Sequence, residues 1–180
     1  MHIWMSTAIV LLSAAFLMPQ HISEEHRAQG NRETLLSGID VYKTHPEEVS
    51  RKLGTPYKAR NVTNGESSGE KQYWWRSGTT RIRGATMYHF EKGQVIESRI
   101  YGVDVWGAPS ASEYAQTGSG LMLGDTESKL VKIYGARFRK QRTQRGTIHI
   151  DLEWKDGTTL GIDFDNHNRI NHMQLISAIE

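Results

Sequence analysis

Polar and apolar residues alternate most regularly in the C-terminal third of the chain. Four large apolar side chains occupy every second position between residues 148 and 154, and the positions between them are polar. A second alternating run covers residues 159–164, after a Lys-Asp-Gly turn. Because successive side chains of a strand point to opposite faces, this pattern predicts an antiparallel hairpin with one buried and one polar face. The predicted buried positions are Ile148, Ile150, Leu152, Trp154, Leu160, Ile162 and Phe164.

Two shorter stretches carry helix signals instead of strand alternation. The first begins at Thr44, a helix-capping residue, has Pro46 and two glutamates in its first turn, and ends at Gly54. The second begins at Asp125 and ends at Gly135, at a constant offset of 81 residues from the first. A capping residue, early acidic residues and a terminal glycine are typical of helices. The sequence therefore predicts two helices in corresponding positions.

Strand-like runs follow both predicted helices in the same order. Three runs lie between residues 71 and 102, and three more lie between residues 147 and 177. Both units close on a hairpin, in which Phe90 corresponds to Phe164. Self-similarity of this kind indicates an internal duplication of one structural unit.

The duplication leads to a fold prediction of the α+β class, with two tandem helix-plus-antiparallel-sheet repeats of two layers each. Repeat 1 is placed at residues 38–102 and repeat 2 at residues 120–177. The segment 103–119 is rich in small and turn-forming residues, so it is predicted to be a linker. Each helix is expected to cover the dry face of the strands that follow it.

An unbroken run of apolar and small residues, Ala8–Met18, lies near the N-terminus and is followed by Pro19. The run is too short for a membrane span, which needs about 20 residues. It is typical of a signal-peptide core, so residues 1–18 are predicted to be a signal peptide. An uncleaved N-terminal anchor over residues 3–18 and a buried helix of the folded domain are the alternatives. Residues 19–37 have mixed charge and no apolar stripe, which predicts a tether or a short surface helix.

Composition narrows the kinds of site that the chain can carry. The 180 residues include no cysteine. Disulfides, thiolate metal sites, a cysteine nucleophile and lipid attachment through cysteine are therefore excluded. The formal net charge is +2, from 22 basic and 20 acidic residues. This balance is not typical of a nucleic-acid-binding protein, and we expect no nucleic-acid partner.

The segment that begins at residue 38 carries two motifs: Leu53-Gly54-Thr55-Pro56 at the end of the predicted helix, and Phe90, Gly93, Val95 and Ile100 in the hairpin that closes the first unit. It is similar to the small outer-membrane assembly lipoproteins of the SmpA/OmlA type and to the duplicated beta-lactamase inhibitor proteins (BLIP-like domains). The resemblance covers most of residues 38–102 and, more faintly, residues 120–177. It implies an envelope or secreted protein that binds other proteins through a sheet surface and catalyses nothing. The chain lacks the lipidated cysteine of the first family and the disulfides of the second.

The aromatic run at residues 73–75 is the main candidate for partner binding. In a strand, Tyr73 and Trp75 share one face while Trp74 lies on the other, and one short helix cannot cover both faces. An exposed aromatic side chain on a rigid strand contributes buried area at low entropy cost. The alternative is that both tryptophans are buried, one under the helix and one between the repeats. The predicted partner-binding residues are Tyr73, Trp74, Trp75, Arg99, Tyr101 and Trp106.

A basic segment at residues 137–145 holds five positive charges in nine residues. Such a segment could contact phosphate, an anionic lipid surface or an acidic partner. The alternative is a solvated connection between a helix and a strand, because blocks of like charge are usually exposed to solvent. The candidate residues are Arg137, Arg139, Lys140, Arg142 and Arg145.

A catalytic alternative rests on the polar face of the predicted C-terminal hairpin. His149, Asp151 and Glu153 project from one strand face, and Asp163 and His172 could join them. Imidazole beside carboxylates could bind a divalent metal or transfer protons. The sequence, however, matches no metal-binding spacing, nucleophile elbow or phosphate-binding loop of known type. We therefore expect no catalytic residue, no metal and no cofactor.

These observations favour a non-catalytic protein-binding module, inhibitor-like or envelope-assembly-like, that is exported or tethered to a membrane. Its expected partner is another envelope or extracellular protein, bound through an aromatic sheet face. Its expected location is the periplasm, the cell envelope or the extracellular space. A hydrolase or metal-dependent enzyme that uses the polar strand face of repeat 2 is the alternative function.

Overall fold

The computed structural model describes Ala28 and residues 32–63, 68–109, 112–135, 138–143 and 147–178. The predicted signal peptide at residues 1–18 lies outside the described residues, as does most of the predicted tether at residues 19–37. Within the part of the chain that is described, no helix has the length and apolar character needed to cross a lipid bilayer.

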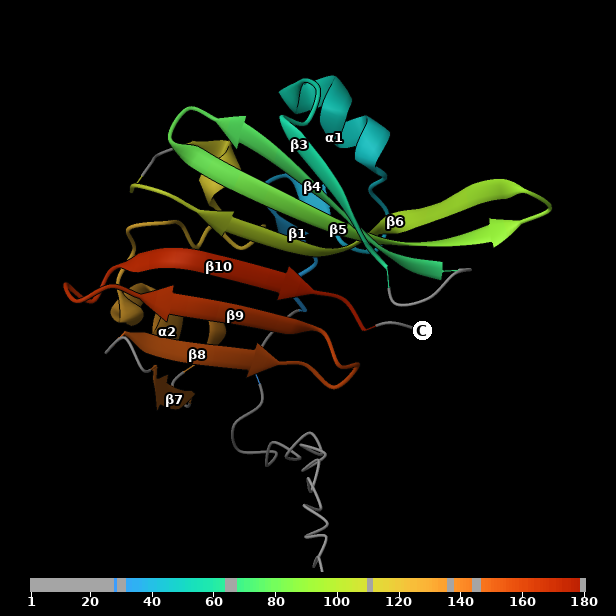
Figure 1. The fold of residues 1–180 in the computed structure, drawn as a ribbon. Coiled ribbons are helices and arrows are strands. Elements are labelled where there is room, and N and C mark those ends of the chain that lie inside the picture. The colour runs from blue at the N-terminus through green and yellow to red at the C-terminus, as the bar shows by residue number, and fades with distance from the viewer. Residues whose placement is uncertain are drawn as a thin grey trace, which may run out of the picture.

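One antiparallel sheet of eight strands dominates the structure, in the order β3-β4-β5-β6-β10-β9-β8-β7 (Figure 1). Strand β6 pairs with β10 from Gly102 opposite Ile176 to Trp106 opposite His172. The strands are β3 (Lys58–Thr63), β4 (Ser68–Ser77), β5 (Thr80–Glu91), β6 (Gln94–Trp106), β7 (Arg139–Arg142), β8 (Ile148–Glu153), β9 (Thr159–Phe164) and β10 (Ile170–Ile176).

The predicted α+β fold of two tandem helix-plus-antiparallel-sheet repeats is therefore wrong. The strands assigned to the two units form one continuous sheet, because β6 of the first unit pairs with β10 of the second. An unpaired edge strand exposes backbone donors and acceptors that can pair with another chain. Pairing β6 with β10 therefore leaves fewer exposed edges than two separate sheets would have. Alternation along a strand predicts its faces but not which distant edge it pairs with.

Two helices of eight residues each precede the two groups of strands: α1 (Pro46–Leu53) and α2 (Glu127–Tyr134). The predicted helices are thus confirmed, although the observed cap positions, His45 and Thr126, each come one residue after the expected cap. The hydroxyl of Thr44 accepts the backbone N–H of Asp40 at 3.0 Å, and His45 occupies the cap position of α1. Gly54 and Gly135 end the helices with φ values of 84° and 101°, which favour glycine.

The core lies on one side of the large sheet, between the strands, both helices and a two-stranded hairpin of β1 (Leu35–Leu36) and β2 (Ile39–Asp40). Figure 1 shows α2 behind strands β8, β9 and β10. The apolar positions predicted for the C-terminal hairpin are confirmed, because its central residues are buried. Fully buried members of the core include Trp75, Ile82, Leu130, Ile150, Leu152, Leu160 and Phe164.

The predicted linker at residues 103–119 begins inside the sheet. Strand β6 continues to Trp106, and Val103 and Val105 are fully buried. Ala115 also joins the core, from the short 3-10 helix η2 (Glu113–Ala115). The small residues of this segment obscured the alternation Val-Asp-Val-Trp, which is a strand pattern with its apolar side inward.

The end of the predicted tether also belongs to the fold. Leu36 is fully buried, and Glu33 is 3% exposed. The Glu33 carboxylate accepts the hydroxyl of Tyr134 at 2.8 Å and the backbone N–H of Ser119 at 3.1 Å. A buried carboxylate needs such donors, so these contacts tie residues 32–37 to α2.

The β5–β6 hairpin extends beyond the neighbouring strands (Figure 1). Its two-residue turn has positive φ at both Lys92 (50°) and Gly93 (79°), as expected of the hairpin turn that matches the twist of paired strands. Most of the exposed large apolar side chains of the described residues lie on this hairpin. They are Met87, Phe90, Val95 and Ile96.

Candidate functional site

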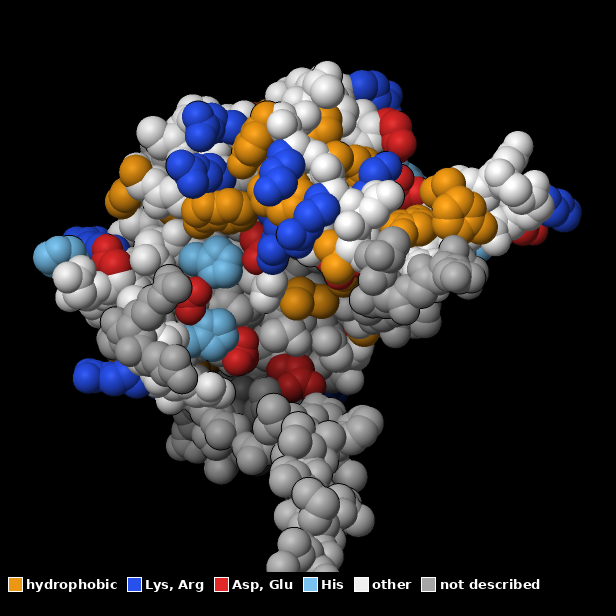
Figure 2. Space-filling view, in the orientation of Figure 1, with side chains coloured by type: hydrophobic (Ala, Val, Ile, Leu, Met, Phe, Trp, Pro, Cys, Tyr) orange, Lys and Arg blue, Asp and Glu red, His pale blue; other side chains and the backbone are white. Residues whose placement is uncertain are grey.

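The sheet face opposite the core forms the candidate site, and we call it the open face. None of the described helices lies on it, and its side chains alternate with the buried ones along each strand. Figure 2 shows Lys and Arg side chains over hydrophobic ones on the upper strands, and His side chains among acidic ones on the lower strands. The side chains of the open face that form the site are Lys58, Arg60, Trp74, Arg76, Arg81, Arg83, Tyr101, Asp104, Trp106, His149, Asp151, Asp163 and His172.

The three aromatic residues of β4 divide between the two faces. Tyr73 and Trp75 are 8% and 1% exposed, and their rings stack in the core with centroids 5.6 Å apart. Their prediction as partner-binding residues is corrected accordingly, because this face belongs to the core that also includes side chains of α1, the small β1–β2 hairpin and η2. Trp74 is half-buried on the open face. The Nζ of Lys58 lies 4.9 Å from the centroid of its ring.

Tyr101 reaches the open face through a β-bulge. Tyr101 and Trp106 are five residues apart, so regular alternation would place them on opposite faces. The register shifts between Ala85 and Thr86, and this shift leaves one extra residue on β6. The Tyr101 hydroxyl then donates to Glu70 at 2.6 Å. Burial and this carboxylate raise the pKa of Tyr101.

Trp106 and Arg99 have different surroundings. Trp106 is half-buried on the open face, and its ring contacts that of His172 edge-on with centroids 6.4 Å apart. Arg99 lies at the edge of the sheet, in a hollow that it shares with Tyr101 and His45. Its guanidinium lies 5.9 Å from the ring centroid of Tyr42. The structure thus brings together Trp74, Tyr101 and Trp106 from the predicted binding residues.

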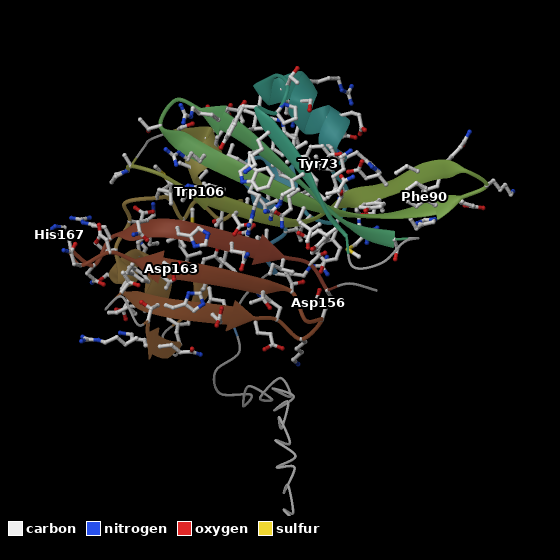
Figure 3. All side chains as sticks on the ribbon, viewed as in Figure 1. Tyr73, Phe90, Trp106, Asp156, Asp163 and His167 are labelled. Atoms are coloured by element: carbon white, nitrogen blue, oxygen red, sulfur yellow. The ribbon has the colours of Figure 1, made fainter. Side chains whose placement is uncertain are left out.

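A chain of alternating charges crosses the open face from β5 to β8, and we call it the His–Asp ladder. The ladder runs in the order Arg83, Asp104, His172, Asp163, His149, Asp151. Successive N–O distances are 2.7, 3.3, 2.8, 2.6 and 2.9 Å. Figure 3 labels Trp106 and Asp163, which flank β10 on this face. Every step except the last, which joins two residues of β8, joins neighbouring strands, so the ladder ties the two halves of the sheet together.

The carboxylates keep both histidines of the ladder protonated. Hydrogen bonds to Asp151 and Asp163 raise the pKa of His149 to about 10. Burial alone would lower the pKa of His172, but its bonds to Asp104 and Asp163 raise it to about 9. The same two imidazoles, His149 first, hold the pKa of Asp163 well below its usual range.

This geometry decides what the ladder can do chemically. His149, Asp151, Asp163 and His172 do converge, as the catalytic alternative requires, but Glu153 is not part of the ladder. All four imidazole nitrogens are bonded to carboxylates. A protonated imidazole has no lone pair for a metal or for a proton from substrate. The described residues contain no group of His, Asp and Glu arranged to hold a metal ion.

The basic segment at residues 137–145 is only partly described. Arg137 and Arg145 lie outside the described residues. Arg139, Lys140 and Arg142 belong to β7, an edge strand, and the Nζ of Lys140 pairs with Glu127 of α2 at 2.5 Å. Charged residues on an edge strand discourage pairing with other chains.

The site also contains residues that the sequence reasoning missed. Asp104 was assigned to the linker, and Arg81 and Arg83 were assigned to a strand without a role. Their alternation with Ile82 and Gly84 is the signal that places both arginines on the polar face.

No protein-family model, curated protein or solved structure matches this chain. The resemblance to outer-membrane assembly lipoproteins and beta-lactamase inhibitor proteins therefore stays a prediction.

Proposed function

We propose that this chain is a non-catalytic protein-binding module, exported or membrane-tethered, that binds another envelope or extracellular protein through its open face. One observation carries the proposal: Trp74, Tyr101 and Trp106 are half-buried on a sheet face that none of the described helices covers. Trp and Tyr dominate the binding energy of many protein interfaces.

The surroundings of these aromatics favour binding because they hold the side chains in place. Tyr101 is hydrogen-bonded to Glu70, and Trp106 packs against His172, which the ladder fixes from both sides. Side chains that are already ordered lose little conformational entropy when a partner binds. The open face therefore presents a preformed binding surface, and its aromatic side chains do not have to become ordered when a partner binds.

The catalytic alternative has less support. Its acid–base groups are engaged with one another, and a hydrolase or metal-dependent enzyme would have to break ladder bonds before His149 or His172 could react. We therefore propose no reaction for the polar strand face.

Alanine substitution of Trp74 and Trp106 tests the binding proposal. We expect each variant to weaken the main partner by about 2 kcal/mol or more, because truncating a central aromatic residue removes its buried contacts. Affinity capture from the envelope fraction of the source cell would identify the partner. Calorimetry with that purified partner would then compare each variant with the wild-type chain.

Phe90→Ala is the matched control for this experiment. Phe90 is 51% exposed and lies on the β5–β6 hairpin, away from the open face (Figure 3). We expect this variant to bind as the wild type does. Full affinity in a folded Trp74→Ala, Trp106→Ala double variant would contradict the proposed site.

The export part of the proposal rests on the apolar run Ala8–Met18 alone. We expect the mature protein to begin after residue 18, as for a cleaved signal peptide. N-terminal sequencing of protein recovered from outside the cytoplasm measures this directly. An intact Met1 on membrane-associated protein would favour the uncleaved anchor instead.

A further inference from the structure

The unpaired positive charge of the open face gathers around Trp74. Within the described part of the chain, no carboxylate pairs with any of four exposed basic residues on strands β3, β4 and β5. Arg83, their neighbour, is by contrast paired with Asp104 at 2.7 Å. We call these four residues the Trp74 basic cluster: Lys58, Arg60, Arg76 and Arg81.

The strand register forces these charges together. Arg76 lies directly opposite Arg81 on the neighbouring strand, and like charges in directly opposed positions destabilise a sheet. Lys58 and Arg60 both approach the ring of Trp74, with Nζ and Cζ at 4.9 and 5.8 Å from its centroid. The free chain thus holds a repulsive arrangement that an anionic partner would relieve.

The rest of the open face does not share this excess of positive charge. The His–Asp ladder balances three carboxylates with three cations. Glu70 lies on β4, four residues before Trp74, and its carboxylate is bonded to Tyr101 and Gln72. The basic region is therefore a bounded patch, with the carboxylates of Glu70 and of the ladder near it and the aromatic side chain of Trp74 at its centre.

We propose that the Trp74 basic cluster docks a carboxylate-rich segment of the protein partner. The inference rests on the proposed function and specifies the chemistry of the partner at that same site. Guanidinium groups bind carboxylates with paired N–H donors, and Trp74 supplies an apolar contact between them. A long, uniform polyanion such as nucleic acid, or an anionic membrane, would also meet the carboxylates that bound the patch, so a short acidic protein segment fits better.

A synthetic probe tests this chemistry before the partner is known. The probe is a fluorescein-labelled peptide of alternating glutamate and tyrosine, and its binding to the full chain is followed by fluorescence anisotropy. We expect the variant Arg76→Gln, Arg81→Gln to bind the probe roughly tenfold more weakly or worse, because two charge contacts are lost. Raising NaCl from roughly 50 to 500 mM should weaken wild-type binding as well. A peptide of alternating glutamine and tyrosine should bind much more weakly than the probe.

Arg51→Gln is the matched control, since Arg51 is an exposed arginine of α1, outside the open face. It should leave probe binding unchanged. If Trp74→Ala weakens binding while the double arginine variant and salt do not, the open face binds but the acidic chemistry is wrong. If neither the arginine variant nor Trp74→Ala has an effect, both this inference and the proposed function are contradicted. Tighter binding of a single-stranded thymidine oligonucleotide, or of vesicles with anionic lipid, through the same arginines would overturn the choice of a protein partner.

Discussion

Trp75→Ala is expected to lower the free energy of unfolding by about 4 kcal/mol, which lies within the range observed when a large buried aromatic side chain is truncated. Trp75 is 1% exposed, stacks on Tyr73, and lies against Gly84, where an added Cβ would come within 3.0 Å of the indole ring. The surrounding sheet cannot collapse into so large a cavity without moving several strands. Denaturant unfolding followed by circular dichroism measures the loss.

Two further variants separate the core role of Trp75 from a binding role. Among the described residues no group accepts the indole N–H of Trp75, so Trp75→Phe removes an unsatisfied donor as well as some volume. We expect this change to cost only about 1 kcal/mol and to leave partner binding intact. Trp74→Ala, one position away on the half-buried side, should cost no more than about 1 kcal/mol. Equal losses for Trp74→Ala and Trp75→Ala would contradict the assignment of the two faces.

Asp163→Asn is expected to lower the free energy of unfolding by about 3 kcal/mol at neutral pH. Asp163 accepts from both His149 and His172, at 2.6 and 2.8 Å, and is the only ladder carboxylate between the two imidazoles. Each hydrogen bond to a charged group contributes about 1.5–3 kcal/mol, and partial exposure of all three side chains reduces the sum. Denaturant unfolding at constant pH measures this change.

The ladder also gives the wild-type protein a defined dependence on pH. The pKa values of His149 and His172 are raised in the folded chain, to about 10 and about 9, above the ordinary value of 6.5. A raised pKa means that the stabilisation is complete below pH 6.5 and is lost as the pH rises through about 9 to 10. The wild type should therefore lose stability progressively between about pH 6.5 and 10, and Asp163→Asn should lose less over that interval.

Glu153→Gln is the control for both measurements, because Glu153 lies on the same strand face but outside the ladder. We expect it to change the stability by no more than about 0.5 kcal/mol and to keep the alkaline loss of the wild type. If the wild type keeps the same free energy of unfolding up to pH 10, or if Asp163→Asn has no effect, the ladder does not stabilise protonated His149 and His172.

Local features of the structure could be predicted from the sequence because they depend on neighbouring residues. Both helices and their terminal glycines were predicted, and so was the dry face of the β8–β9 hairpin. Strands β3 and β7 were missed because edge strands carry little alternation, and their basic sequences were interpreted as connections. The first residues of the fold were missed for a related reason, since Glu33 is a buried carboxylate with no apolar stripe around it.

The candidate site was only partly predictable. Four residues of the ladder were named: His149 and Asp151 from their positions on one strand face, and Asp163 and His172 as residues that could join them. Asp104 was not named, because it lay within the predicted linker. It meets His172 from 68 positions away in the sequence, across a strand pair that no local pattern specifies. The sheet face on which Tyr101 lies could not be predicted either, since it depends on a β-bulge.

The sequence by itself determined that an aromatic strand, Tyr73 to Trp75, has two faces and that a polar face lies on the C-terminal hairpin. Only the tertiary structure decided that Trp75 belongs to the core and Trp74 to the open face, and that both halves share one sheet. The physical reason is that alternation is a property of one strand, whereas strand order, register and bulges depend on pairing between segments far apart in the chain. That pairing brings Trp74, Tyr101 and Trp106 onto the same surface as the basic cluster and the ladder.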